Sequence, residues 1–213
     1  MKRGASFGAP RNIEKLIPLR APFDKYMRAF WTMLCGLALG FGVTAATVES
    51  GSGFGAFRVG PWTAWPRAGG PEIDPYARAG LARRGEAPLG RDEGLVFAAS
   101  ADSAGGALDG RCDYRVADPL PAARYWTLGL ASPSGAPLAN PAERLGYTSA
   151  DIVRREGGAF ELVISRHARP GNWLSPGDAN FFVLVLRLYE TPLDTTARLD
   201  PARFLKIVKL GCE

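Results

Sequence analysis

The sequence predicts a mainly β protein, an antiparallel β-sandwich of the jelly-roll type with one short helix, preceded by a single transmembrane helix. Two observations lead to this prediction. Residues 29–48 form an uncharged segment between a basic tail and Glu49. Beyond that segment, short apolar runs alternate with turn signals rich in Gly, Pro, Ser and Asp, and no repeat of fixed period is visible. Short strands separated by such turns are typical of antiparallel sandwiches and jelly rolls.

The uncharged segment has the length of a membrane span. At a rise of 1.5 Å per residue, twenty helical residues measure about 30 Å, which is the thickness of the hydrocarbon core of a bilayer. Residues 1–28 contain seven Lys or Arg and two acidic residues. The positive-inside rule therefore predicts a cytoplasmic tail over 1–28, an anchor over 29–48 in the bacterial inner membrane, and a periplasmic part over 49–213.

A cleaved signal peptide is the alternative, because small residues around Ala45 and Ala46 form acceptable cleavage sites. The long tail and the length of the uncharged run both exceed those of an ordinary signal peptide, so an uncleaved signal anchor is favoured. Gly36 and Gly40 have the spacing that lets two membrane helices approach closely. That spacing is also common in single spans, and the oligomeric state stays open.

The formal charge of +5 does not indicate a nucleic-acid partner. The tail accounts for the whole excess, and residues 49–213 hold 19 basic and 19 acidic side chains. A domain without net positive charge lacks the electrostatic signature of binding to a phosphate backbone.

The exported part is predicted to be one domain over 57–213, joined to the membrane by a flexible glycine-rich spacer over 49–56. Asp74 and Pro75 form an N-cap signal for a short helix over 76–84, which Gly85 would end. A second such pair, Asp200 and Pro201, predicts one helical turn. Strands are expected over 95–99, 111–116, 125–131, 137–139, 150–155, 160–165, 181–189 and 204–210. The run 181–189 is nearly all apolar, so it is either buried on both faces or a central strand.

The three cysteines divide by location. Cys35 lies within the span, where a lone thiol acts as a small apolar residue. Cys112 and Cys212 both lie in the exported part, and in an oxidising compartment such a pair is predicted to form a disulfide. Two free buried thiols are the alternative.

Several motifs of the exported part follow one another in a family-like order. Tyr125-Trp126-Thr127-Leu128, Gly171-Asn172-Trp173-Leu174 and Leu186-Arg187-Leu188-Tyr189 are the main ones, with Gly135, Asn140-Pro141 and Asn180-Phe181 between them. Together they resemble the domain of unknown function 1214 family. Gly60-Pro61-Trp62-Thr63 and the surroundings of the two exported cysteines look like its short, membrane-anchored bacterial members. The resemblance implies a jelly-roll sandwich and transfers no catalytic residue.

Searches for familiar catalytic patterns give little. The chain has one His and no CxxC, HExxH or Walker-type motif, so neither a metal nor a cofactor is predicted. Residues 4–8 match GxSxG, but no strand precedes them and the nucleophile-elbow geometry is not available.

Three groups of side chains remain as candidates. Trp62, Trp65 and Trp173 lie in irregular segments where an exposed indole could bind a ligand, although structural packing is the favoured explanation for them. His167 and Arg169, next to Arg166, suggest a weak anion site or an ordinary solvated loop. Four carboxylates could support glycoside cleavage, although their spacing does not pair them: Glu143, Asp151, Glu161 and Asp178.

These observations favour a membrane-tethered periplasmic domain that binds or organises an envelope component, either a glycan or a protein. The alternative is a glycan-active hydrolase that uses paired carboxylates.

Overall fold

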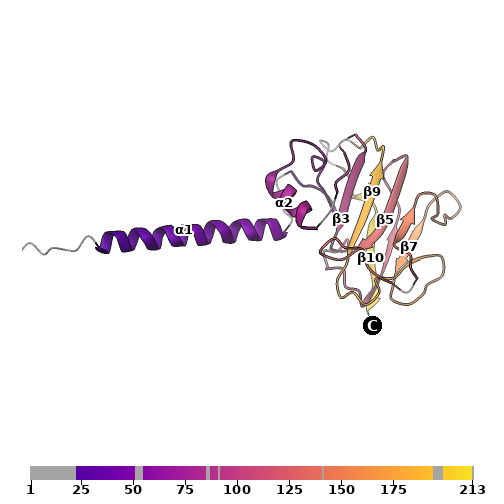
Figure 1. Ribbon diagram of the computed structural model, residues 1–213. Coiled ribbons are helices and arrows are strands. Elements are labelled where there is room, and N and C mark those ends of the chain that lie inside the picture. Colours follow the sequence, from indigo (N-terminus) through magenta and orange to yellow (C-terminus); the bar gives the residue numbers. More distant parts are fainter. Residues whose placement is uncertain are drawn as a thin grey trace, which may run out of the picture. The chain divides into compact units, whose positions relative to one another are not determined.

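The computed structural model describes residues 23–50, 55–84, 87–90, 92–140, 142–193 and 199–212. These residues form two α-helices, one 3-10 turn and ten strands arranged in two sheets (Figure 1). The chain divides into two compact units with a boundary between Thr44 and Ala45. Most of the predicted tail (1–22), the middle of the predicted spacer (51–54) and Gly85 lie outside the described residues.

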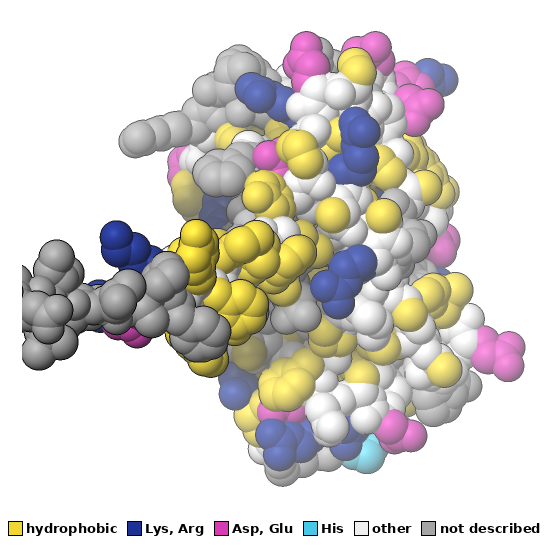
Figure 2. Space-filling model, turned by 60° about the vertical axis from the view of Figure 1, so that its left-hand side comes forward, with side chains coloured by type: hydrophobic (Ala, Val, Ile, Leu, Met, Phe, Trp, Pro, Cys, Tyr) yellow, Lys and Arg dark blue, Asp and Glu magenta, His cyan; other side chains and the backbone are white. Residues whose placement is uncertain are grey.

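Helix α1 (Phe23–Ser50) contains the predicted span. Residues Asp24–Val48 are long and apolar enough, by length and composition, to cross a membrane. Large apolar side chains project from this stretch into the surroundings, as Figure 2 shows in yellow; Phe41, for example, is 73% exposed. A signal sequence near the N-terminus has the same properties, so the structure supports an apolar N-terminal helix and leaves its processing open. The helix also includes Glu49 and Ser50, which were predicted to belong to the spacer.

The larger sheet has six strands in the order β1-β2-β3-β9-β5-β6. Their bounds are β1 (Phe57–Val59), β2 (Trp62–Ala64), β3 (Gly94–Ala99), β9 (Val183–Tyr189), β5 (Tyr125–Ala131) and β6 (Gly146–Thr148). The smaller sheet has the order β10-β4-β7-β8, with β10 (Lys206–Cys212), β4 (Cys112–Ala117), β7 (Glu161–Ile164) and β8 (Asn172–Leu174). The mainly β architecture with two sheets is confirmed.

The sheets are not closed, so the jelly-roll topology is not confirmed, and one strand pair departs from the predicted antiparallel order. β8 runs parallel to β7, with Leu162 beside Asn172 and Ile164 beside Leu174. The loop that joins the two strands brings the chain back to the start of β7, and Gly171 adopts a left-handed φ of 82° immediately before β8. Glycine takes this conformation without steric cost, which allows the parallel return within a short loop.

Both sheets share one hydrophobic core. Along β3, β9 and β5 every second side chain is buried, as the two-residue period of a strand requires. Phe204, which precedes β10, contacts Phe97 at 4.9 Å and Trp62 at 5.9 Å between ring centroids. β9 lies between β3 and β5, which confirms the prediction of a central strand. Its second face is half-buried rather than covered.

The predicted helices are confirmed at their caps. α2 (Pro75–Arg84) begins as expected, with the Asp74 carboxylate accepting hydrogen bonds from the Tyr76 and Ala77 amides at 2.9 and 3.1 Å. Asp200 caps the 3-10 turn Pro201–Arg203 in the same way. The strands expected over 137–139 and 150–155 are wrong, because each of these segments contributes only an isolated bridge. Four strands of three residues each were not predicted, because three residues are too few to show the two-residue period of a strand: β1, β2, β6 and β8.

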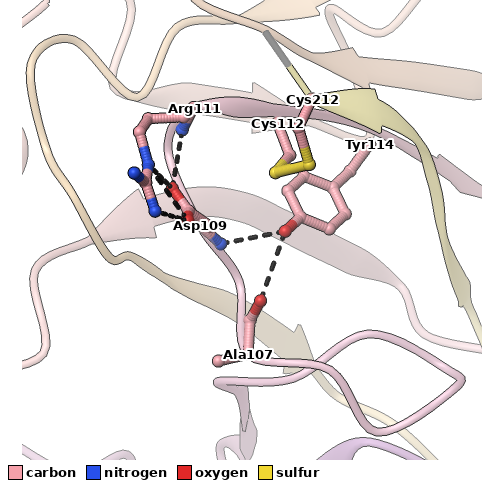
Figure 3. Close-up of a disulfide and its surroundings, with 6 residues drawn as sticks. All are labelled: Ala107, Asp109, Arg111, Cys112, Tyr114 and Cys212. Carbon is pink, nitrogen blue, oxygen red and sulfur yellow. Dashed lines mark hydrogen bonds and ion pairs between the residues drawn. A yellow bond between two sulfur atoms is a disulfide. The ribbon is translucent and has the colours of Figure 1, made fainter.

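The predicted disulfide is confirmed: Cys112 and Cys212 are bonded and face each other across β4 and β10, with Cα atoms 3.9 Å apart (Figure 3). Beside it, Arg111 donates to Asp109 at 2.6 Å, and this hydrogen bond lowers the pKa of the Asp109 carboxyl to about 2. The Asp109 amide donates to the Tyr114 hydroxyl at 2.9 Å, and burial raises the pKa of that phenol. These contacts order the turn that leads into β4, and the disulfide joins the start of β4 to the C-terminal strand.

The disulfide is expected to be a main source of stability. Cys112→Ser with Cys212→Ser should lower the free energy of unfolding by about 2–5 kcal/mol, because the closed loop of 100 residues no longer restricts the unfolded chain. Urea unfolding of the detergent-solubilised full chain would measure this change. Cys35→Ser is the control and should change nothing, because Cys35 is an exposed free thiol on α1. Equal stability of the double variant and the parent would contradict a structural role for the bridge.

Candidate functional site

The six-stranded sheet carries a groove on the face turned away from the core. We call it the outer groove; its volume is about 650 Å³. Its floor is made of the outward-facing residues of the strands, which are Thr63, Val96, Ala98, Gly129, Val183, Val185 and Arg187. One wall comes from the segment before β3, with Trp65, Pro66, Tyr76, Leu81 and Leu89. The other comes from the turn after β5 and the approach to β6, with Pro133, Pro137 and Leu145. A hollow of this size lies in the range of small-molecule sites.

The floor follows from the strand register. Arg58, Thr63, Ala98, Val185 and Gly129 are register partners in turn, so they form one row across neighbouring strands on the same face. All but the first are small or β-branched, and such a row leaves a shallow depression where larger side chains would have covered the sheet. The wall residue Leu145 is 59% exposed, so the edge of the groove is apolar and open to solvent.

Glycine allows β5 and β6 to approach closely at one side of the groove. Gly129 and Gly146 face each other across the two strands. A Cβ at Gly129 would lie 2.8 Å from the Leu145 carbonyl oxygen, which is closer than real Cβ contacts. The absence of a side chain at Gly129 therefore both permits the pairing and keeps this part of the floor low.

The charged groups of the outer groove are all basic among the described residues that line it. Arg58 stands on the edge strand β1, and Arg187 stands on the central strand β9. Neither guanidinium forms an ion pair or a hydrogen bond within the described part of the chain. On the face of the molecule drawn in Figure 2, Lys and Arg side chains lie among hydrophobic ones, and Asp and Glu lie mostly toward the margin. The groove thus combines apolar surface with cations that lack carboxylate partners.

Trp65 adds a second kind of unsatisfied donor. The indole lines the groove, and its Nε1 atom is buried without a hydrogen-bond partner among the described residues. A buried donor without an acceptor costs about 1–3 kcal/mol, so such groups usually have a reason to persist. Trp65 follows Ala64, the register partner of Phe97, and so lies next to the row that contains Val96 and Arg187.

Two of the three predicted ligand-binding tryptophans have structural roles. Trp62 is fully buried, and its Nε1 donates to the Leu205 carbonyl at 2.8 Å. Trp173 is half-buried on β8, and its Nε1 donates to the Ser165 carbonyl at 2.8 Å. Of the three, only Trp65 lines the outer groove.

The predicted anion site does not assemble as a set of free cations. Arg169 forms an ion pair with Asp113, so its charge is neutralised locally. His167 is exposed, and its backbone amide donates to the Ser165 hydroxyl at 3.2 Å. Both residues lie outside the groove lining.

None of the four candidate carboxylates lines the outer groove. Asp151 accepts hydrogen bonds from Thr148 and pairs with Arg144; burial opposes ionisation, but these contacts outweigh it and lower the carboxyl pKa. Glu161 pairs with Arg155 at 2.9 Å. Glu143 and Asp178 are exposed. No group of three or more His, Cys, Asp or Glu side chains capable of holding a metal occurs among the described residues.

The Gly171-Asn172-Trp173-Leu174 motif has a structural role. The buried Asn172 accepts a hydrogen bond from the Val153 amide at 2.8 Å and donates to the carbonyls of Val153 and Glu161 at 2.7 and 2.9 Å. The next residue, Trp173, donates its amide to the Tyr147 hydroxyl at 3.1 Å. Asn172 therefore ties the turn after β6 to the smaller sheet.

Comparison with known proteins agrees with this architecture. Residues 93–193 match the family described as protein of unknown function (DUF1214). The match covers a little less than half of the chain, so this part is similar to that family. The matched segment begins just before β3 and ends after β9. The matched segment supplies most of the groove floor and one wall. The residues before it supply the other wall, together with Arg58, Thr63 and Trp65.

Two solved structures are similar to the chain. The VPA0106 protein of Vibrio parahaemolyticus is 18% identical, with a TM-score of 0.50 over 65% of this chain and 36% of that one. An uncharacterized protein of Burkholderia cenocepacia is 20% identical, with a TM-score of 0.36 over 58% of this chain and 31% of that one. This chain thus spans about a third of the length of these structures. The likeness to VPA0106 concerns the fold alone. No curated protein sequence matches.

Substitution of the two tryptophans near β2 should lower the free energy of unfolding by very different amounts. Trp62→Ala should destabilise the protein by about 3–5 kcal/mol, because it empties a core site and leaves the Leu205 carbonyl unpaired. Trp65→Phe should cost little, because it removes a donor that has no partner. Urea unfolding of both variants would test this contrast. Comparable losses from the two substitutions would place Trp65 in the core.

Proposed function

We propose that this protein is a membrane-tethered, periplasmic binding domain whose outer groove holds an envelope component. The observation that carries the proposal is the groove itself, an apolar hollow on an otherwise regular sheet, lined by unpaired donors. Packing normally covers such a face, and an exposed apolar concavity is typical of a binding site.

The tether supports an envelope location. Asp24–Val48 has the length and composition of a span, and the Cys112–Cys212 disulfide fits an oxidising compartment. Ala56, the first groove-lining residue, follows Val48 by eight positions, which is at most about 29 Å of extended chain. A short segment therefore joins the apolar helix to the domain that carries the groove.

The chemistry of the lining favours binding over hydrolysis. Among the described residues that line the groove there is no Asp, Glu, His or Cys, so the groove offers no paired carboxylates. The hydrolase alternative would need such a pair next to a bound substrate. The four carboxylates considered above lie outside the groove lining.

The topology has a direct test. The full chain should stay with membranes after alkaline washing, and a C-terminal tag should be accessible to protease from the periplasmic side. Recovery of a soluble product that begins near Ala46 would instead establish cleavage and would contradict a permanent anchor.

Binding in the groove can be tested in cells with a photo-reactive amino acid. Benzoylphenylalanine at Val183, on the groove floor, should form an adduct with an envelope component on irradiation, detectable as a mass increase of the purified chain. The matched control is the same residue at Val208, an exposed position on β10 of the smaller sheet. Ala98→Trp, which fills the floor, should abolish the Val183 adduct. Equal labelling at both positions, or none at Val183, would contradict a groove-specific ligand.

A further inference from the structure

The distribution of charge along the groove identifies the class of its ligand. Arg187, Val185 and Val183 point outward in succession from β9, two residues apart. At about 3.4 Å per residue, Val183 lies about 14 Å along the strand from Arg187. Arg187 and Trp65 thus mark one end of the floor, and Val183, Ala131 and Pro133 mark the other.

The first of these ends is rich in donors. Arg187 contributes a guanidinium without a carboxylate partner in the described chain, and Trp65 contributes a buried indole N–H without an acceptor. Arg58 stands to one side, three strands from β9 and therefore about 14 Å away across the sheet. The indole N–H is covered by the protein, whereas the guanidinium of Arg187 is positively charged and donates hydrogen bonds. The complementary ligand group is therefore an acceptor that carries negative charge.

The opposite end carries no charged side chain among the described lining residues; Ser100 and Ser132 are its polar side chains, and apolar side chains make up the rest. Val183, Ala131, Pro133 and Pro137 offer neither charge nor side-chain hydrogen bonds, and Leu145 extends this surface along the wall. A ligand that satisfies both ends has an anionic head and an extended apolar body. Burial of methylene groups along such a floor is favourable, so an acyl chain is a suitable body.

From this juxtaposition we propose that the outer groove binds a single-chain anionic amphiphile, with its phosphate or carboxylate at Arg187 and its chain along β9 toward Pro133. The inference rests on the proposed function and adds the chemical class of the ligand. A volume of about 650 Å³ and an exposed apolar edge suit a ligand that enters the groove from the side.

Photolabelling of the full chain in phosphatidylcholine nanodiscs tests the proposal. The probe is dodecyl phosphate with a diazirine in its chain, and the comparison probes carry the same chain on a maltoside or a trimethylammonium head. Peptide mapping separates adducts on the groove strands from adducts on residues 29–48. Labelling of the helix reports partition into the bilayer, so the ratio of groove to helix adducts reports binding. We expect the phosphate probe to give the highest ratio.

Arg187→Gln should lower the ratio for the phosphate probe about tenfold, because a charge-assisted hydrogen bond is lost, and should leave the maltoside probe unchanged. Arg187→Lys should retain part of the binding, and Arg58→Gln should have a smaller effect. Arg115→Gln is the matched control, because Arg115 is exposed on β4 and lies outside the groove lining. Melting temperatures of the variants would show that they are folded.

The outcomes separate the two proposals. If all three probes label the groove equally and Arg187→Gln has no effect, the anionic head is wrong and an apolar binding groove stands. If folded protein gives no groove adduct with any probe while the helix is labelled, both the ligand class and its binding in the groove are wrong. An effect of Arg115→Gln as large as that of Arg187→Gln would also overturn the specific role of Arg187.

Discussion

The packing of Phe204 against Trp62 and Phe97 is the contact on which the β-sheet domain depends most. It joins three segments that are far apart in the sequence, namely β2, β3 and the approach to β10. The Trp62 indole also donates to the Leu205 carbonyl, so the same site satisfies its only polar atom. Trp62 precedes the matched segment 93–193 and Phe204 follows it. Their contact therefore joins the two parts of the chain that flank this segment.

The outer groove depends on that contact. β2 pairs with β3 only through Thr63 and Ala64, and the groove wall with Trp65 and α2 follows directly in the chain. The burial of Trp62 holds this short strand in register, because a slip by one residue would move the indole to the outer face. The disulfide has a comparable role on the smaller sheet, where it fixes the end of β10 to β4. A stable core thus positions a surface on its opposite side.

Much of the fold was predictable because several signals agreed locally. The Asp74–Pro75 cap, the apolar run of β9 and the cysteine pair each have a single simple interpretation, and each was confirmed. Three-residue strands carry no usable period, and the parallel pairing of β8 depends on where a loop returns rather than on the composition of the strand. Residues 150–155 precede a glycine turn, as the first strand of a hairpin would, but Asn172 binds the backbone groups of Val153 in place of a neighbouring strand.

The site was less predictable for a physical reason. Exposed tryptophans are common ligand-binding residues, and they were predicted as such from the sequence. In the structure, the indole N–H groups of Trp62 and Trp173 donate to backbone carbonyls, and both rings have packing roles. The groove is instead made by small residues such as Ala98 and Gly129, which mark only the absence of side-chain volume. One signal was present: β9 is apolar on both faces, although a sheet with one solvated face usually alternates. An apolar outer face interrupted by Arg187 therefore indicates a strand that contacts something other than water, and the register places that surface beside Trp65.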